Sequence, residues 1–313
     1  MKVIGIDIGG SSIKAGIVCI EKGLFKKVYS EENLPLRTNE FIEIKEKVIE
    51  ICNKKLSEGA DRFVGISTAG SVDNTGTVIS AGNFNNYRNV SWKEIITKEF
   101  GKMSVSTIND GRASAWGEYS VSNPKAKTHI HAVIGTGIGG GVIHNGELLQ
   151  GDSGQAGYIG HIKITADKTP LCSCGKMGCV ETLASAKGIL AKYNDLGYYK
   201  YNTFNELIDN FNMDKNRIIN VFEESGYWLG VALGNVMNVL NPQCVTVGGG
   251  VILATLHCTN KYSLENNPYM NGVERGIHYA THRRVEATGS VICGVLGNNA
   301  GIIGAANLVV ASK

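Results

Sequence analysis

Short apolar runs that end in glycine alternate along this chain with longer segments of helical periodicity. The run at 3–8 has the pattern of a buried strand and ends in the glycine turn 9–11, and a second run at 13–20 follows at hairpin distance. Between 40 and 58, apolar residues recur at spacings of three and four, which predicts an amphipathic helix. The same alternation predicts further elements, namely strands at 63–66 and 105–108 and a helix at about 112–119. Strands that alternate with helices indicate an α/β fold.

A second copy of the strand–glycine–strand pattern occupies 130–143. The strand 130–134 leads into the glycine-rich turn 135–141, and extended structure resumes at 142–143. We interpret this as an internal duplication of a phosphate-binding hairpin, with one hairpin in each of two domains. The remaining pattern predicts a long helix at 217–240, a strand at 245–247 that ends in glycine, and a helix of small residues at 297–310.

The repeated hairpin also suggests a division of the chain. We expect an N-terminal α/β domain at 1–118, completed by the C-terminal helix 297–313, and a C-terminal α/β domain at 119–296. No linker rich in proline or serine separates the two, so the boundary depends on the motif repeat alone. Segment 255–270 is polar and rich in asparagine, and its pattern assigns no element.

Composition excludes several classes of protein. The chain has 313 residues, of which 43% are hydrophobic and 19% charged, and its formal net charge is +3. This balance argues against intrinsic disorder and against a strongly basic nucleic-acid-binding protein. No run of 18 apolar residues suggests a transmembrane helix, and Asp7 stands where a signal peptide needs its apolar core. We therefore expect no membrane partner and no nucleic-acid partner.

The first glycine turn carries candidate phosphate chemistry. Glycines after a strand let backbone N–H groups approach an anion, and the Ser11 hydroxyl adds a donor. Asp7 would repel a phosphate directly, so its position makes sense if Mg²⁺ or a metal-bound water lies between them. Lys14 would supply positive charge nearby. The alternative is an ordinary hairpin with a surface aspartate.

Two further glycine turns follow predicted strands. The turn 135–141 has five glycines in seven residues and superficially resembles a dinucleotide fingerprint. That fingerprint opens a helix, whereas extended structure follows here, so we reject the dinucleotide interpretation. A bulged hairpin is the structural alternative. Gly248, Gly249 and Gly250 would suit a flat group, such as adenine, lying against the backbone.

Asn109 and Asp110 follow a predicted strand, where α/β proteins place their sites. A carboxylate there can act as general base on a sugar hydroxyl. The structural alternative is that Asp110 only caps the helix predicted at 112–119.

The chain has eight cysteines, and their distribution predicts a metal site. Three of them lie close together as Cys172, Cys174 and Cys179, with His161 upstream, and the other five are scattered among mostly apolar neighbours. One imidazole and three thiolates make a closed, structural zinc site, with a disulfide or a chance cluster as alternatives. Zinc on one nitrogen of His161 would leave the other to meet a ligand, and the same knuckle would place Glu181. The scattered cysteines do not form a disulfide framework, which predicts a reducing cytoplasm.

With these motifs, the sequence resembles the ROK family, bacterial sugar kinases and sugar-responsive repressors of the actin/hexokinase-like superfamily. The resemblance covers essentially the whole chain. The combination of a histidine with C-x-C-G-x-x-G-C-x-E is highly specific, and the glycine turns are shared with the wider superfamily. The segments that carry it are 7–11, 66–73, 109–110, 135–141, 154–161, 172–181 and 296–301.

The resemblance implies a two-domain actin-like ATPase (ribonuclease H-like) fold whose cleft closes over sugar and ATP with Mg²⁺, a zinc knuckle at 161–181, and a homodimer. Asp110 matches the catalytic base, which takes the proton from the sugar 6-hydroxyl as that hydroxyl attacks the γ-phosphate. The residues implied to contact sugar are Gly70, Asn83, Asn109, Asp110, Tyr158, His161 and Glu181. The residues implied on the nucleotide side are Asp7, Gly9, Gly10, Ser11, Lys14, Thr136, Gly137, Gly249 and Gly250. The implied zinc ligands are His161, Cys172, Cys174 and Cys179.

The chain departs from the family pattern at several positions. Tyr158 stands where the family usually has a glutamate that contacts the sugar near its C1 and C2 hydroxyls. A tyrosine cannot accept two hydroxyl hydrogen bonds as a carboxylate does, so plain glucose is in question, and some N-acetylmannosamine kinases of the family also lack this glutamate. Asn299 replaces a usual aspartate, Ala69 a usual proline and Ser11 a usual threonine.

The motifs and the resemblance leave two classes of function. The first is an ATP-dependent kinase for the 6-hydroxyl of a hexose or N-acylhexosamine. The second is a sugar-sensing or transcription-regulatory member without activity. Repressors of the family carry a helix-turn-helix domain ahead of the first phosphate turn, and here that turn begins at residue 7, which favours the kinase.

Overall fold

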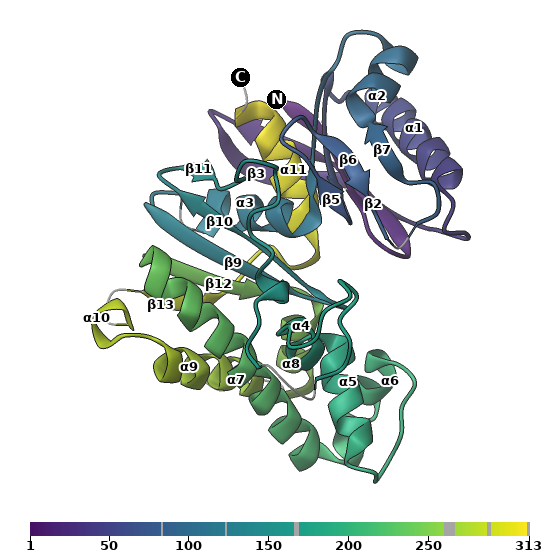
Figure 1. Cartoon of the computed structure of the whole chain (residues 1–313). Helices are drawn as coiled ribbons and strands as arrows, with labels where there is room; N and C mark the ends of the chain where they lie inside the picture. Colours follow the sequence, from purple (N-terminus) through teal and green to yellow (C-terminus); the bar gives the residue numbers. More distant parts are fainter. Residues whose placement is uncertain (83, 123, 166–168, 260–266, 287–288, 312–313) are drawn as a thin grey trace. The chain divides into compact units, whose positions relative to one another are not determined.

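The computed structural model describes residues 1–82, 84–122, 124–165, 169–259, 267–286 and 289–311. The chain divides into two compact units (Figure 1). Unit 1 comprises Met1–Lys125, Gly141–Gly157 and Asn298–Lys313, and unit 2 comprises Ala126–Gly140 and Tyr158–Gly297. Segment 141–157, which the sequence-based division gives to the second domain, is thus grouped with unit 1.

A five-stranded mixed sheet forms the centre of unit 1, with strand order β3-β2-β1-β4-β8. Strand β1 pairs antiparallel with β2 and parallel with β4, and β4 pairs parallel with β8. Its strands are β1 (Lys2–Ile8), β2 (Ser12–Glu21), β3 (Leu24–Pro35), β4 (Phe63–Thr68) and β8 (Ser104–Asn109). A small antiparallel sheet contains β5 (Ser71–Val72), β6 (Thr77–Ser80) and β7 (Arg88–Ser91). The helices of unit 1 are α1 (Phe41–Ser57), α2 (Trp92–Phe100), α3 (Asp110–Ser122) and α11 (Ala300–Ala311).

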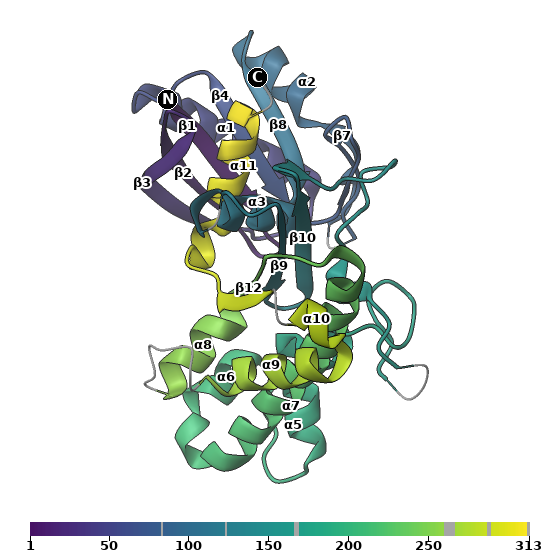
Figure 2. The ribbon, with the colours of Figure 1, turned by 90° about the vertical axis from the view of Figure 1, so that its left-hand side faces the viewer.

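The two faces of this sheet are buried by different helices, as the alternation within β1 requires. Ile4, Ile6 and Ile8 belong to the core shared with α1, whereas Val3 packs with Ile302 of α11. Figure 2 shows α11 beside α3 on one side of the sheet.

Glycines in β1 and β4 allow α11 to lie close to the sheet. A Cβ at Gly5 would lie 2.5 Å from the Ile302 side chain, and one at Gly65 would lie 2.1 Å from the carbonyl oxygen of Ala305. Any side chain at these positions would push the helix outward.

The second sheet repeats the order of the first, as β11-β10-β9-β12-β13. Its strands are β9 (Thr128–Ile134), β10 (Ile138–His144), β11 (Glu147–Leu148), β12 (Cys244–Gly248) and β13 (Ser290–Cys293). The equivalent places of β1–β2 and β9–β10 confirm that the strand pair is repeated, and its binding of phosphate stays a prediction. Strand β10 crosses the boundary between the two units at Gly141. One detail of the prediction is wrong: the turn covers only Gly135, Thr136 and Gly137, because β10 already begins at Ile138.

The other helices belong to unit 2. They are α4 (Glu181–Ala184), α5 (Ala186–Asp195), α6 (Phe204–Asp209), α7 (Lys215–Leu240), α8 (Gly250–Thr259), α9 (Pro268–Ala280) and α10 (Arg283–Glu286). Short 3₁₀ turns lie at Ile159–His161, Phe211–Met213 and Gly297–Asn299. Among the described residues, none of the helices combines the length and apolar character needed to span a membrane.

Helices α7 and α9 lie side by side at a glycine contact (Figure 1). A Cβ at Gly226 would lie 2.0 Å from the carbonyl oxygen of Tyr269, and one at Gly230 would lie 2.1 Å from that of Val273. A Cβ at Gly276 of α9 would lie 2.1 Å from the carbonyl oxygen of Tyr227. The backbones therefore approach more closely than any larger residue allows.

We predict that Gly230→Ala lowers the free energy of unfolding by about 3 kcal/mol, because the helices must separate to admit the methyl group. Chemical denaturation followed by circular dichroism measures this. Gly250→Ala is the matched control: Gly250 also lies in a helix, and a Cβ there has no neighbour within 4 Å. Equal effects of the two substitutions would contradict the close-packing interpretation.

Candidate functional site

The carboxyl ends of three parallel strands meet in unit 1. The strand registers place Asp7 of β1 opposite Ser67 of β4, and Thr68 of β4 opposite Asn109 of β8. The Ser67 hydroxyl donates a hydrogen bond to Asp7 Oδ1 at 2.5 Å. Parallel strands place their ends on one edge of the sheet, which is where α/β proteins bind ligands.

Asp7 is held among groups that control its charge. Burial raises the pKa of its carboxyl, while the hydrogen bond from Ser67 and the positive charge of Lys14 oppose that rise. Its space is tightly limited, since a Cβ at Gly301 would lie 2.8 Å from Asp7 Cγ. A divalent cation would favour the ionised carboxylate, so this residue fits the oxygen chemistry that Mg²⁺ requires.

Asn109 and Asp110 are neighbours at the start of α3, but their side chains make different hydrogen bonds. The backbone N–H of Arg112 donates to Asn109 Oδ1 at 3.2 Å, which is the pattern of a helix cap. The alternative in which Asp110 is only the cap is therefore wrong, because Asn109 has that role. Asp110 Oδ1 accepts from Asn109 Nδ2 and from the N–H of Gly111, both at 2.8 Å. Among the described residues no hydrogen bond reaches Asp110 Oδ2, so this oxygen is available to a ligand.

The charge state of Asp110 is also unusual. Although the residue is exposed, the protein around its carboxyl disfavours the charged form, and the nearby carboxyl of Asp7 repels it. Together these raise the pKa of Asp110 to about 6. A carboxylate with such a pKa takes up a proton more readily near neutral pH than an ordinary aspartate.

In unit 2, the turn after β9 is held by residues that follow in sequence much later. The N–H of Ile138 donates to Glu181 Oε2 at 2.8 Å, and a Cβ at Gly137 would collide with that carboxylate. Gly249 has φ +100°, and a Cβ there would lie 2.4 Å from the carbonyl oxygen of Ile134. The turn, the start of α4 and the end of β12 therefore meet.

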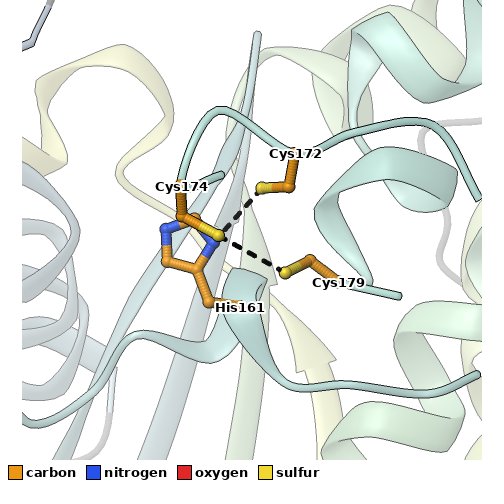
Figure 3. Close-up of side chains that lie close together, drawn as sticks. All are labelled: His161, Cys172, Cys174 and Cys179. Atoms are coloured by element: carbon orange, nitrogen blue, oxygen red, sulfur yellow. Dashed lines mark hydrogen bonds between the residues drawn. The ribbon is translucent and has the colours of Figure 1, made fainter. Parts of the chain in front are cut away.

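Four candidate zinc ligands come together in unit 2 (Figure 3). The ligand atoms of His161, Cys172, Cys174 and Cys179 all lie within 4.8 Å of one another. The Sγ atoms of Cys174 and Cys179 are 3.7 Å apart, and Cys172 Sγ lies 3.5 Å from His161 Nδ1.

These distances fit a tetrahedral zinc site. With Zn–S near 2.3 Å and Zn–N near 2.0 Å, two ligand atoms are separated by about 3.8 Å for sulfur pairs and about 3.5 Å for sulfur and nitrogen. All three cysteines are free thiols, so the structure has no disulfide among Cys172, Cys174 and Cys179. Because Nδ1 is the nitrogen that faces Cys172, Nε2 is the ring atom left for a ligand.

The remaining predicted residues have different environments. Asn83 lies outside the described residues. The carbonyl oxygen of Gly70 accepts a hydrogen bond from Asn109 Nδ2 at 2.9 Å. The ring of Tyr158 stacks on that of His161, with centroids 5.8 Å apart. Thr136 is exposed. Gly10 and Ser11 of the first turn are exposed as well.

Sequence reasoning missed three contributors, Ser67, Arg112 and Gln155. Ser67 could have been found, since it directly follows the strand predicted at 63–66 and lies in the segment 66–73 that carries the resemblance. Gln155 lies in the segment 154–161 that carries the resemblance, and Arg112 starts the helix predicted at 112–119. No local pattern signalled their contacts, because these join distant segments.

Comparison with solved structures defines the class of fold first. The crystal structure of a ROK family glucokinase from Streptomyces griseus, in complex with glucose and AMPPNP, superposes with a TM-score of 0.78. It is 27% identical, and the match covers 98% of this chain and 99% of that one. The chain is thus a mixed α/β protein of the actin-like ATPase fold.

The family follows from the sequence. The model of the ROK family matches residues 3–312, so the chain belongs to this family. A glucokinase of Halalkalibacterium halodurans is 28% identical over 98% of this chain and 94% of its own. An N-acetylmannosamine kinase of Vibrio cholerae is 30% identical over 81% of this chain and 85% of its own. A xylose repressor of Bacillus spizizenii is 29% identical over 79% of this chain but 60% of its own.

Proposed function

We propose that this protein is a sugar kinase that transfers the γ-phosphate of ATP to the 6-hydroxyl of a hexose or an N-acylhexosamine. The observation that carries this proposal is the Asp110 carboxyl, which two hydrogen bonds hold through Oδ1 while Oδ2 has none among the described residues. Relatives named glucokinase and N-acetylmannosamine kinase support the same class of reaction.

In the proposed reaction Asp110 acts as the general base. The sugar 6-oxygen attacks the γ-phosphorus, its proton passes to Asp110 Oδ2, and the bond from phosphorus to the β–γ bridging oxygen breaks to release ADP. Asn109 keeps the carboxyl oriented through its 2.8 Å hydrogen bond. Asp7 would hold Mg²⁺, which neutralises phosphate charge when bound.

The other proposed roles follow the resemblance. Gly9, Gly10 and Ser11 would bind phosphate through the first turn, and Thr136 and Gly137 through the second. Gly249 and Gly250 would lie against the nucleotide. The phosphates are anions, and the backbone N–H groups of glycine turns can donate hydrogen bonds to them.

Sugar contacts in unit 2 would come from His161 and Glu181. Zinc held by His161, Cys172, Cys174 and Cys179 would have a structural role, because four protein ligands leave no position for water. The ring of His161 would then present Nε2 to a sugar hydroxyl.

Tyr158 bears on which sugar is used. Its phenol cannot replace the paired acceptors of a carboxylate, but its ring, stacked on His161, offers an apolar surface to an acyl group. We therefore propose that N-acylhexosamines are better substrates than glucose.

A sugar panel with Mg-ATP tests the function. We expect turnover, measured as ADP release, with an N-acylhexosamine such as N-acetylmannosamine and slower turnover with glucose. Tyr158→Glu is expected to shift the ratio of kcat/KM toward glucose. The absence of turnover with every hexose and N-acylhexosamine would contradict the proposal.

The alternative is a sugar-sensing or regulatory protein without kinase activity. The xylose repressor relative and the altered residue at 158 favour it. This alternative predicts that a sugar raises the melting temperature while no ADP is formed.

A further inference from the structure

The carbonyl oxygen of Val72 accepts hydrogen bonds from two side chains of distant segments. Arg112 Nη2, from α3, donates at 2.8 Å, and Gln155 Nε2 donates at 3.1 Å. β5 is an edge strand of its small sheet, with β6 on one side. The two side chains therefore satisfy the Val72 carbonyl on the side of β5 where the described residues form no further strand.

Gln155 contacts β5 a second time. Its Oε1 accepts a hydrogen bond from the hydroxyl of Ser71 at 2.5 Å. One planar amide thus accepts from Ser71 and donates to the next residue, as a neighbouring strand would. These two hydrogen bonds of the Gln155 amide are made to Ser71 and Val72, the two residues of β5.

This short strand is joined directly to the proposed acceptor site. Gly70 precedes Ser71, has φ +102°, and accepts from Asn109 Nδ2 through its carbonyl oxygen at 2.9 Å. A Cβ at Gly70 would lie 2.4 Å from the carbonyl oxygen of Ser80, so the segment has little freedom on its far side. The N–H of Arg112 in turn donates to Asn109 Oδ1.

Arg112 is only 3% exposed. A buried guanidinium with a directed fork of donors fixes the groups that it contacts more tightly than a surface side chain does. It links Val72 to Asn109, and Asn109 links Gly70 to the carboxyl of Asp110.

We propose that Gln155 and Arg112 are positioning residues for the phosphoryl acceptor. By sharing the carbonyl of Val72 they hold the backbone at Gly70, and through Asn109 they hold Asp110 at the orientation that the sugar hydroxyl requires. This inference depends on the proposed function, since it assigns these residues to the same reaction. Neither touches the reacting atoms, so both act through other residues.

The chain provides a matched control for this role. Asn74 Nδ2 donates to the carbonyl oxygens of Gly151 and Asp152, at 3.0 and 2.9 Å. Asn74→Ala therefore loosens the same loop on the same hairpin without disturbing the contacts of Val72. A purely structural role of the loop predicts equal effects of Asn74→Ala and Gln155→Leu.

The test compares steady-state kinetics of Gln155→Leu and Asn74→Ala with those of the full wild-type chain. We expect Gln155→Leu to lower kcat about 10-fold and to raise the KM for sugar, with the KM for ATP within twofold, because a misplaced acceptor loses rate while nucleotide contacts remain. Asn74→Ala is expected to keep both constants within twofold, even where its melting temperature falls equally.

Two further variants decide the matter if Gln155→Leu does not fold. In Gln155→Glu the side chain still accepts from Ser71, but it turns an oxygen toward the carbonyl of Val72. Arg112→Lys keeps the positive charge but loses the planar set of guanidinium donors. Both variants should show a lower kcat and a higher KM for sugar, with the KM for ATP within twofold. Unchanged kcat and sugar KM in the folded variants, or an equal loss in Asn74→Ala, would overturn the positioning role alone. A wild-type chain inactive on every sugar would instead overturn the proposed function.

Discussion

Asp110→Asn is expected to lower kcat by about 10²–10⁴-fold while sugar binding is retained. The amide has the size of the carboxyl and can keep the contacts with Asn109 and Gly111, but it cannot take the proton from the sugar hydroxyl. ADP release at saturating sugar measures the loss, and the sugar-dependent rise of the melting temperature reports binding.

Asp195→Asn is the control for this substitution, because it removes an exposed carboxylate at the end of α5 without touching the site. Its kcat should equal that of the wild type. An Asp110→Asn variant with full kcat would exclude the general-base role.

The same carboxyl sets the expected pH dependence. The base acts only when ionised. The surrounding protein, which disfavours the charged form, and the charge of Asp7 together raise the pKa of Asp110 to about 6. Activity is therefore present above this pH, and kcat/KM should fall as the pH decreases through about 6. A profile flat down to pH 5 would contradict this assignment.

Cys174→Ser is expected to remove the zinc, which wild-type protein should hold at about one ion per chain. Elemental analysis of the purified chain measures this. The KM for sugar should also rise, by about 10-fold or more, because His161 and Glu181 lose the support that orients them. The KM for ATP should change much less.

Cys258→Ser is the matched control, since Cys258 is a half-buried free cysteine of unit 2 outside the cluster. It should keep both the metal and the sugar KM. Full zinc content in Cys174→Ser, or an unchanged sugar KM after complete metal loss, would show that the knuckle does not organise the sugar contacts.

Local patterns explain which parts could be predicted from the sequence. The strands that end in glycine were recognisable because buried apolar runs and turn residues are both encoded within a few positions, as at 3–11. The four zinc ligands were recognisable because three of them lie within eight residues. Both signals are independent of the rest of the fold.

Other elements had no local signal. Strand β3 is rich in charged residues and lies at the edge of its sheet, so it needs no continuous apolar pattern. Helix α9 overlaps the polar segment 255–270, and it is the close contact of Gly276 with α7 that specifies its packing. Tertiary contacts decide both.

The links around the acceptor were also beyond sequence reasoning. Gln155 and Val72 are 83 positions apart, and Asn109 and Gly70 are 39 apart. Only the fold brings such side chains to one strand. The sequence could not decide whether Asn109 or Asp110 caps α3, because both side chains can accept a hydrogen bond there; in the structure Asn109 is the cap.

The most direct test of the account is the position of the new phosphate. Wild-type protein is incubated with Mg-ATP and the best sugar of the panel, and the product is analysed by ³¹P–¹H correlated NMR. We predict a single phosphate ester coupled to the two C6 protons, and no product from the 6-deoxy analogue. Phosphate on another oxygen, or equal turnover of the 6-deoxy sugar, would contradict a kinase in which Asp110 activates the primary alcohol.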